Sequence, residues 1–151
     1  MAHVEILRGT VTALQTEILA RRYYESFNER DFDAGERFVD AEAVFTYPQS
    51  PQQFIGRAGY RELARRWIAA FPDSSYSIGY VAVIDPTTVR TEWVMHGTHL
   101  GDLLLPGLPP MPATEVHAHV KFRETIRIVN GLIVESVTEF DPDELRRRLA
   151  A

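Results

Sequence analysis

The sequence predicts an α+β fold, in which three N-terminal helices wrap one face of a curved antiparallel sheet and a short helix ends the chain. Apolar residues recur at helical spacing through much of the first 71 residues. From residue 76 onward, polar and apolar residues alternate instead, which is typical of strands. The 151 residues are 45% hydrophobic and hold no internal repeat, so we expect a single domain over residues 1–151 with a sizeable core.

Three helices are expected before the strands. The first runs from about residue 10 to residue 28 and carries apolar side chains on one face: Leu14, Ile18, Leu19, Tyr23, Tyr24 and Phe27. A short second helix is expected at 33–39 with Asp33 as its N-cap, and a third at 57–71. Near the C-terminus, Asp141 suits the N-cap of a final helix that starts at Pro142. This capping role accounts for Asp141 without any catalytic function.

Five strands are expected, at residues 43–47, 76–84, 89–98, 115–129 and 132–140. Two turn signals separate them: "DPTT" at 85–88 and the Asn-Gly pair at 130–131, a strong signal for a hairpin. Consecutive strands joined by such short turns pair antiparallel.

The segment 97–114 is rich in glycine, proline and leucine and interrupts this order. It is a stiff crossover between two strands, an apolar lip over a pocket mouth, or both at once. The lip is considered because a merely solvated loop does not need Leu103, Leu104 and Leu105.

Composition excludes several classes of protein. The net charge is −5 without a block of like charges, which argues against a nucleic acid or an anionic membrane as partner. The absence of cysteine excludes disulfides and thiolate metal sites. No signal peptide and no long apolar run is present, so we expect a soluble, cytoplasmic protein. No phosphate loop and no flavin or nicotinamide fingerprint is found, and no cofactor is expected.

The strand "HAHVKFRETIRI", residues 117–128, contains one residue of unexpected polarity. Its alternate positions Ala118, Val120, Phe122, Glu124, Ile126 and Ile128 share one face. Five of these six side chains are apolar, so this face should point into the protein and take Glu124 with it. Burial among apolar groups raises the pKa of a carboxyl group toward neutrality, which suits a general base. The alternative is a structural glutamate that is hydrogen-bonded to Ser136, Thr138 or water, or paired with an arginine.

Several segments carry a family resemblance. They are "YYESFNERDFDAGERFV", "FIGRAGYRELARRWIAAFPD", "WVMHGTHLGD" and "FRETIRIVNGLIVES" followed by "FDPDELRRRLA". Together they resemble the SnoaL-like polyketide cyclases, within the nuclear-transport-factor-like cone-shaped α+β superfamily. The resemblance implies a sheet and three helices around one deep, apolar cavity. It also implies cofactor-free acid/base chemistry on a hydrophobic small molecule, in the lyase or isomerase class.

The chain departs from the family pattern at the catalytic positions. Aligned on the Gly131 turn, the position of the family's first histidine is occupied by Glu124, and its His-Trp-Asp run reads Ser136-Val137-Thr138. A threonine hydroxyl does not titrate near neutral pH and cannot replace the aspartate. Three interpretations stay open: an acid/base enzyme with Glu124 as general base, a cofactor-independent hydroxylase, or a non-catalytic module for ligand binding or dimerisation.

Aromatic residues on inward-facing positions suggest a flat, polycyclic or aromatic ligand. The expected ligand contacts are Tyr24, Phe27, Tyr47, Trp67, Tyr80, Trp93, His99, Ser136 and Thr138. The family's pocket carries aromatic residues on its first helix, so Tyr23 or Tyr24 is the preferred contact.

The outward-facing residues of the last two long strands suggest assembly. His117 and His119 are spaced as two metal ligands could be, but no third ligand is evident and we expect no bound metal. Basic residues on one strand face acidic residues on the next, and such rows can pair across a two-fold axis. We therefore expect a homodimer through the outer face of the sheet, as is usual in the family.

Overall fold

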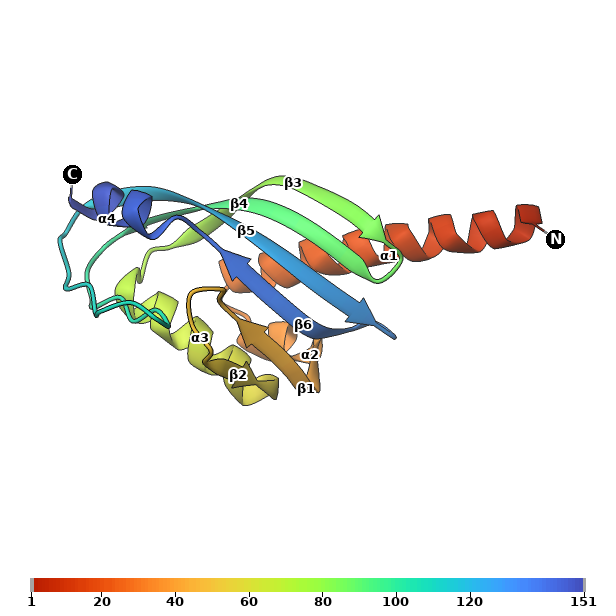
Figure 1. Cartoon of the computed structure of the whole chain (residues 1–151), viewed down its shortest axis with the longest axis horizontal. Coiled ribbons are helices and arrows are strands. Elements are labelled where there is room, and N and C mark those ends of the chain that lie inside the picture. The colour runs from red at the N-terminus through yellow and green to blue at the C-terminus, as the bar shows by residue number, and fades with distance from the viewer. Residues whose placement is uncertain (1, 151) are drawn as a thin grey trace.

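The computed structural model describes the backbone of residues 2–150 and the side chains of residues 13–150. Ten elements follow one another along the chain (Figure 1). They are α1 (Ala2–Asn28), α2 (Phe32–Arg37), β1 (Val39–Thr46), β2 (Gln53–Ile55), α3 (Gly56–Ala70), β3 (Ser75–Asp85), β4 (Thr88–Thr98), β5 (His117–Val129), β6 (Leu132–Glu139) and α4 (Pro142–Ala150). The predicted α+β class, with helices first and a short helix last, is confirmed.

The six strands form one curved sheet in the order β2-β1-β6-β5-β4-β3. Neighbours pair antiparallel except β1 and β6, which are parallel, so the sheet is mixed where a purely antiparallel one was expected. A parallel pair needs a long crossover. Here the crossover from β1 to β6 contains α3 and four strands, and a pairing so distant leaves no local signal in the sequence.

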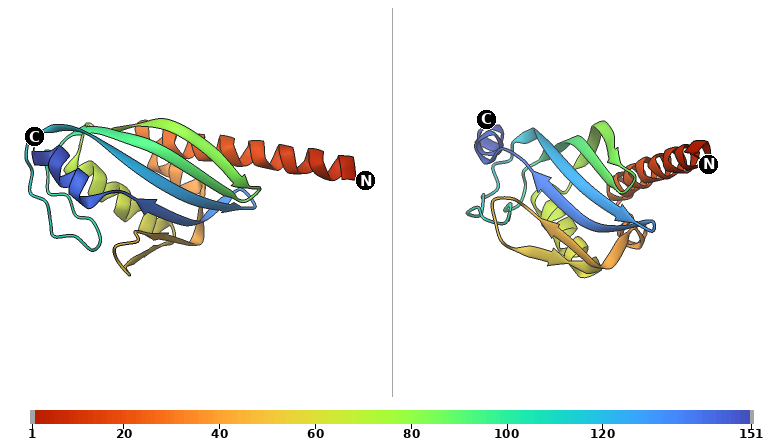
Figure 2. Two further views of the ribbon diagram at one scale, coloured as in Figure 1. Left: turned by 45° about the horizontal axis from the view of Figure 1, so that its top comes forward. Right: turned by 45° about the vertical axis from the view of Figure 1, so that its right-hand side comes forward.

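The first three helices cover the inner face of the sheet (Figures 1 and 2). α1 packs on β3 and β4, and α3 packs on β1 and β2. The short α4 packs on β5 and buries Leu145 and Leu149 in the same core. The helices and the concave face of the sheet thus enclose the space in which the candidate site lies.

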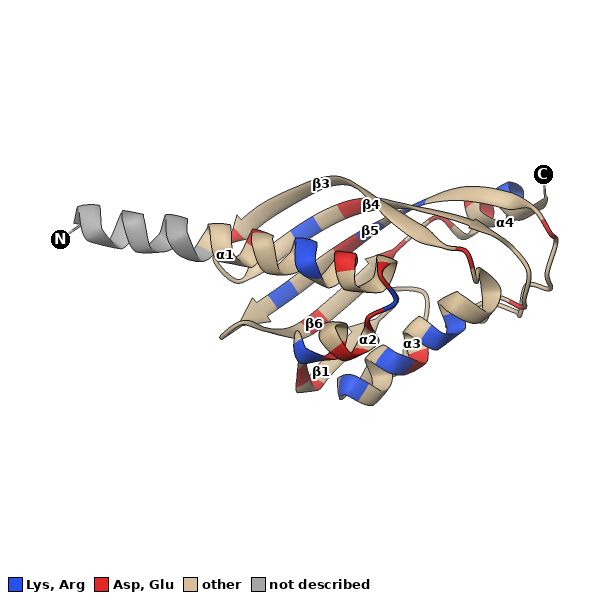
Figure 3. Cartoon of the chain, turned by 180° about the vertical axis from the view of Figure 1, so that it is seen from behind, with Lys and Arg blue, Asp and Glu red and all other residues tan. Residues whose placement is uncertain are grey.

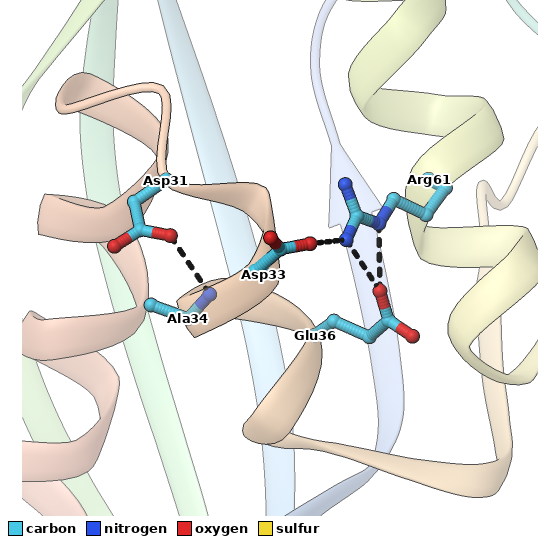
Figure 4. A network of polar contacts seen from close by, with 5 residues as sticks. All are labelled: Asp31, Asp33, Ala34, Glu36 and Arg61. Atoms are coloured by element: carbon cyan, nitrogen blue, oxygen red, sulfur yellow. Dashed lines mark hydrogen bonds and ion pairs between the residues drawn. The ribbon is translucent and has the colours of Figure 1, made fainter.

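The short α2 is held by a cap and an ion-pair network (Figure 4). Its N-cap is Asp31, whose side chain accepts a hydrogen bond from the Ala34 amide at 3.0 Å. The prediction of Asp33 as N-cap was wrong by two positions. Asp33 lies in the first turn and, with Glu36, accepts hydrogen bonds from Arg61 of α3 at 2.5 and 2.7 Å. These contacts tie α2 to α3.

A bulge in β3 reverses the facing of its second half. Ile78 pairs with Trp93 and Tyr80 with Glu92, so the register shifts around Gly79. Such an extra residue moves the following side chains to the opposite face. Tyr80 therefore points outward and is 39% exposed. Its prediction as a ligand contact, which assumed unbroken alternation, was wrong.

The segment between β4 and β5 joins antiparallel neighbours, so it is a long hairpin connection and not the expected crossover, and it does not form a lip over the cavity. Leu103 and Leu105 are buried in the core, where their apolar area is removed from water, and Leu104 is partly exposed. A bridge between Leu103 and Met111 closes the segment on itself. No residue of 97–114 lines the cavity between the helices and the sheet that is described below.

Charged positions are spread over helices and strands, with basic residues recurring along α3 (Figure 3). Among the described residues, none of the helices has the length and apolar character that crossing a membrane requires.

Candidate functional site

A cavity lies between the helices and the inner face of the sheet. It is lined by Tyr23, Tyr24, Phe27, Phe45, Tyr47, Tyr60, Leu63, Ala64, Trp67, Tyr76, Trp93, Glu124, Ser136 and Thr138. These side chains come from α1, α3 and five strands of the sheet. The free volume is about 70 Å³, the liquid volume of roughly two water molecules.

Glu124 occupies the inner face of β5, as its alternation predicted, and only 6% of it is exposed. In the sheet it lies directly opposite Thr91 of β4 on one side and Thr138 of β6 on the other. Strand alternation places all three side chains on the inner face. Glu124 is the only acidic residue among the side chains that line the cavity.

Two hydroxyl groups hold the carboxylate of Glu124. The Tyr24 hydroxyl donates to Oε1 and the Ser136 hydroxyl donates to Oε2, each at 2.5 Å. The Tyr24 oxygen also lies 2.6 Å from the Thr91 hydroxyl. Because Tyr24 gives its single proton to Glu124, Thr91 is the donor in this second bond. The result is a buried chain of hydroxyls from β4 through α1 to the carboxylate.

Burial raises the pKa of Glu124 above its ordinary value of 4.5, because removal from water disfavours the charged form. The hydrogen bonds from Ser136 and Tyr24 act in the opposite direction, as does the nearby Trp93 indole N–H. No Lys, Arg or His is among the lining residues. The carboxylate is therefore stabilised by neutral donors alone.

The lining tyrosines remain neutral hydrogen-bond donors. Burial raises the pKa of Tyr23, Tyr24 and Tyr76, and the charge of Glu124 raises each of them further. Burial likewise raises the pKa of Tyr47, and it raises that of Tyr60 to about 12. The cavity thus offers several phenol hydroxyls, one carboxyl group and no cation.

The Trp93 indole N–H is a buried donor in the cavity lining that has no acceptor at normal hydrogen-bond geometry. Trp93 follows Thr91 by two residues on β4, which makes it a diagonal neighbour of Glu124 across the strand pair. The N–H lies close enough to favour the charged form of Glu124 but does not form a hydrogen bond of normal geometry. Its ring stacks on Phe122 at 4.5 Å between centroids.

Seven of the nine predicted ligand contacts line the cavity: Tyr24, Phe27, Tyr47, Trp67, Trp93, Ser136 and Thr138. Tyr80 does not, for the reason given above. His99 is fully buried outside the cavity lining, where it stacks on Phe71 at 5.2 Å and its Nδ1 lies 3.1 Å from the Thr114 hydroxyl. It therefore contacts the segment between β4 and β5 and not the cavity.

Thr91 was missed from the sequence although it is bonded to Tyr24. Its inward position on β4, two residues before Trp93, was the available signal. Phe45 and Leu63 were also missed as cavity residues, since apolar side chains on inward faces look the same whether they fill the core or line a cavity.

Within the described part of the chain, no three His, Cys, Asp or Glu side chains are arranged to hold a metal ion. The absence of a bound metal stays a prediction.

The solved structures that resemble this chain share its fold at low sequence identity. A candidate polyketide cyclase from Xanthomonas campestris pv. campestris is 22% identical, with a TM-score of 0.73 over 91% of this chain and 98% of that one. A candidate hydroxylase, AclR from Streptomyces galilaeus, is 18% identical with a TM-score of 0.72 over 91% and 96%. A candidate ketosteroid isomerase from Kribbella flavida is 15% identical with a TM-score of 0.63 over 84% and 78%.

Sequence comparison identifies the family more directly than these structures do. No curated protein matches the chain significantly. The profile of the SnoaL-like domain matches residues 20–136, which hold most of the cavity-lining side chains, Glu124 among them. The chain belongs to the SnoaL-like domain family.

Proposed function

We propose that the protein is a cofactor-independent acid/base enzyme that acts on a hydrophobic small molecule, with Glu124 as its general base. The observation that carries this proposal is a single buried carboxyl group, with raised pKa, that lines an apolar cavity and has no cation beside it. Perturbed carboxyl groups in cavities concentrate at functional sites.

The carboxylate retains the capacity to accept a proton. An ionised carboxylate has about four lone-pair positions, and Tyr24 and Ser136 use two of them. In the proposed step, a C–H bond next to a substrate carbonyl breaks and its proton bonds to a Glu124 oxygen. The electron pair forms an enolate, whose oxygen takes the negative charge. Return of the proton to a different carbon completes an isomerisation. In a ring closure, the enolate carbon instead bonds to a second carbonyl carbon, and the proton held by Glu124 goes to the alkoxide oxygen that results.

The apolar surroundings tune Glu124 for this role. A base works best when its pKa is near the working pH, and burial moves the pKa of Glu124 in that direction. Hydrogen bonds from Tyr24 and Ser136 keep the group oriented while it changes charge. Similar folds with names in the cyclase, isomerase and hydroxylase classes support small-molecule chemistry in general and do not select one reaction.

The size of the cavity favours a compact ligand. Pockets for drug-sized molecules usually measure several hundred Å³, whereas the free volume here is about 70 Å³. A polycyclic ligand, as expected from the aromatic lining, requires these side chains to move apart. A ligand of one ring requires the least rearrangement.

The competing function is a non-catalytic module for ligand binding. Two observations favour it: Ser136-Val137-Thr138 stands where the family carries His-Trp-Asp, and both oxygens of Glu124 already accept hydrogen bonds, as in a structural glutamate. A test must therefore separate proton transfer from binding.

Isomerisation of 3-cyclohexen-1-one to its conjugated isomer, followed by ultraviolet absorbance, provides that test. The reaction moves one proton between two carbons and needs no co-reactant. We expect the protein to accelerate it and Glu124→Gln to lower kcat by about 10²-fold or more, the usual contribution of a positioned base. Glu135→Gln on the outer face of β6 is the matched control and should leave the rate unchanged.

Two outcomes would contradict the proposal. Binding of the ketone without acceleration would favour the binding module. Equal rates for the wild type and Glu124→Gln would show that another group moves the proton.

A further inference from the structure

Three buried polar atoms among the described side chains have no hydrogen-bond partner: the Tyr60 hydroxyl, Trp93 Nε1 and His99 Nε2. A buried donor without an acceptor costs roughly 1–3 kcal/mol, so proteins usually pair such groups with protein, water or a ligand. Each of the three therefore indicates where a missing acceptor could bind.

Two of these atoms point away from the cavity or lie outside it. The Tyr60 hydroxyl packs against Gly35, where an added Cβ would lie only 2.0 Å from it, and it is close to Ser26. His99 belongs to the connection between β4 and β5 and does not line the cavity. Neither can receive a ligand that is bound beside Glu124.

Trp93 differs from both. Its ring lines the cavity, 4% of the residue is exposed, and its N–H is a diagonal neighbour of the carboxyl group of Glu124. The N–H lies near that carboxyl group but forms no hydrogen bond of normal geometry with it, so a better-aligned acceptor can bind to the indole. An acceptor on this N–H would lie within the cavity and next to the proposed base.

We infer that Trp93 Nε1–H is the binding donor for a carbonyl oxygen of the substrate, which is a neutral, compact ring ketone or enone. This inference rests on the proposed function and specifies the substrate class of the same site. The donor is neutral and the cavity contains a carboxyl group without a cation, so an anionic ligand would be repelled. The free volume of about 70 Å³ is smaller than the roughly 150 Å³ of an apolar cavity that binds benzene, so a single ring is the largest ligand that small movements of the lining side chains would admit.

The same donor would act in the proton-transfer step. When Glu124 takes the proton from the carbon next to the carbonyl, negative charge develops on the carbonyl oxygen. A fixed N–H that already contacts this oxygen stabilises the charge without having to reorient. Trp93 would then bind the carbonyl in the ground state and hold it more strongly in the transition state, while Glu124 moves the proton.

Nuclear magnetic resonance of the indole groups tests this inference without any need for turnover. The chain has two tryptophans, so a ¹⁵N spectrum contains two indole N–H signals, and Trp67 is an internal reference in the same cavity. Cyclohexanone and methylenecyclohexane are the probes, because they share a shape and differ only in the carbonyl oxygen. We expect cyclohexanone to move the Trp93 N–H proton signal downfield and methylenecyclohexane to leave it without that shift.

Trp93→Phe removes the donor and keeps an aromatic ring. The dissociation constant of cyclohexanone should rise about five- to tenfold, the effect of one neutral hydrogen bond. That of methylenecyclohexane should change less than about twofold, since no hydrogen bond is lost. Equal weakening of the binding of both probes by Trp93→Phe would overturn the inference. So would a downfield shift of the Trp67 signal in place of the Trp93 signal, which is measured on the wild type alone.

The inference and the proposed function fail in distinguishable ways. If cyclohexanone shifts the Trp93 signal but 3-cyclohexen-1-one is not isomerised, the donor is correct and Glu124 is not a catalytic base. If isomerisation depends on Glu124 while the Trp93 signal does not respond to cyclohexanone, the base is correct and the carbonyl has another donor.

Discussion

The outer and inner faces of β4 and β5 surround their carboxylates with different partners. On the outer face, Glu92 of β4 lies 3.3 Å from Lys121 and 3.8 Å from Arg123 of β5, and both cations are at least half exposed. On the inner face, Glu124 of the same β5 is buried and meets only hydroxyl groups and an indole N–H. The outer carboxylate is paired and solvated, whereas the inner one is neither.

This difference separates a structural carboxylate from a reactive one. Water and cations stabilise the charged form on the outside, so protonation there has little consequence near neutral pH. Inside, burial disfavours the charge, and the protonated and ionised forms become closer in free energy. A group in that condition can exchange a proton with a bound molecule. Each prediction below alters one face and measures whether the contrast holds.

The largest expected effect concerns stability against pH. The pKa of Glu124 is raised in the folded protein, so below about pH 4.5, its ordinary value, both states are protonated and the contribution to stability is complete. As the pH rises toward the folded-state pKa, the unfolded chain loses the proton first and the free energy of unfolding falls. The loss is about 1.4 kcal/mol for each unit between the two pKa values.

Urea unfolding of the wild type and Glu124→Gln between pH 4 and 8 measures this loss. The variant should lack it, so the difference in unfolding free energy between the two proteins should change with pH in that window. Glu135→Gln, an exposed control, should run parallel to the wild type. Parallel curves for Glu124→Gln as well would mean that Glu124 titrates as an ordinary surface group.

Removal of one inner hydroxyl should have the next largest effect. Tyr24→Phe deletes a 2.5 Å hydrogen bond to Glu124, which favours the charged form, so the pKa of Glu124 should rise further. A hydrogen bond to a charged group corresponds to about one to two pKa units. A ¹³C titration of the glutamate carboxyl groups measures the shift. Tyr23→Phe, one residue earlier, is the matched control and should shift the pKa less, because the hydrogen bonds that act on Glu124 come from Ser136, Tyr24 and Trp93 and not from Tyr23.

We propose that two copies of the chain associate through the outer face of the sheet. Any single substitution there should have a smaller effect than the changes at Glu124 and Tyr24. The exposed row on β5 carries Lys121, Arg123 and Arg127, and Arg127 lies opposite Glu135 of β6. Such mixed rows can pair with a second copy across a two-fold axis. Sedimentation should give twice the 17.2 kDa of the chain. Arg127→Glu should weaken the dimer. Arg65→Glu, on the exposed side of α3, is the control and should not weaken it. A wild-type monomer at micromolar concentration would contradict the proposal.

Neutralising the outer carboxylate should matter little for stability. Glu92→Gln breaks two ion pairs whose cations are 62% and 50% exposed. Exposed pairs contribute at most about 1 kcal/mol, so the unfolding free energy should fall by less than that. The measurement is urea unfolding at neutral pH. A loss above 2 kcal/mol would mean that the outer face depends on its charges as strongly as the inner face depends on its hydrogen bonds.

The sequence predicts the facing of Glu124 because β5 alternates without interruption around this residue; its register with β6 shifts only between Arg127 and Ile128, after Glu124. It fails at Tyr80, where a bulge at Gly79 interrupts an otherwise similar strand. A bulge depends on how neighbouring strands fit together, which alternation within one strand cannot reveal.

Distance along the chain explains what else was missed. Tyr24 and Glu124 are separated by 100 positions, so their hydrogen bond is a property of the tertiary fold. The parallel pairing of β1 with β6 and the three-residue β2 likewise lack a local pattern. The core placement of Leu103 and Leu105 depends on the path that the segment between β4 and β5 takes.

The smallest expected effect, none at all, concerns metal ions. The outer face brings His96 opposite His119, with ring centroids 4.5 Å apart, and His117 follows at 5.5 Å from His119. This third histidine was not considered as a ligand from the sequence. However, His96 Nε2 lies 3.0 Å from the Ser77 hydroxyl and His117 Nδ1 lies 3.0 Å from the Thr98 hydroxyl. These contacts fix two of the rings on separate partners, whereas a zinc site needs its nitrogen ligands to converge on one point at about 2.0–2.1 Å. Elemental analysis of the untagged protein should therefore find no stoichiometric zinc, and a chelator should leave the melting temperature unchanged. One zinc per chain in the wild type that is lost in His119→Ala would contradict this prediction and would assign a metal site to the outer face.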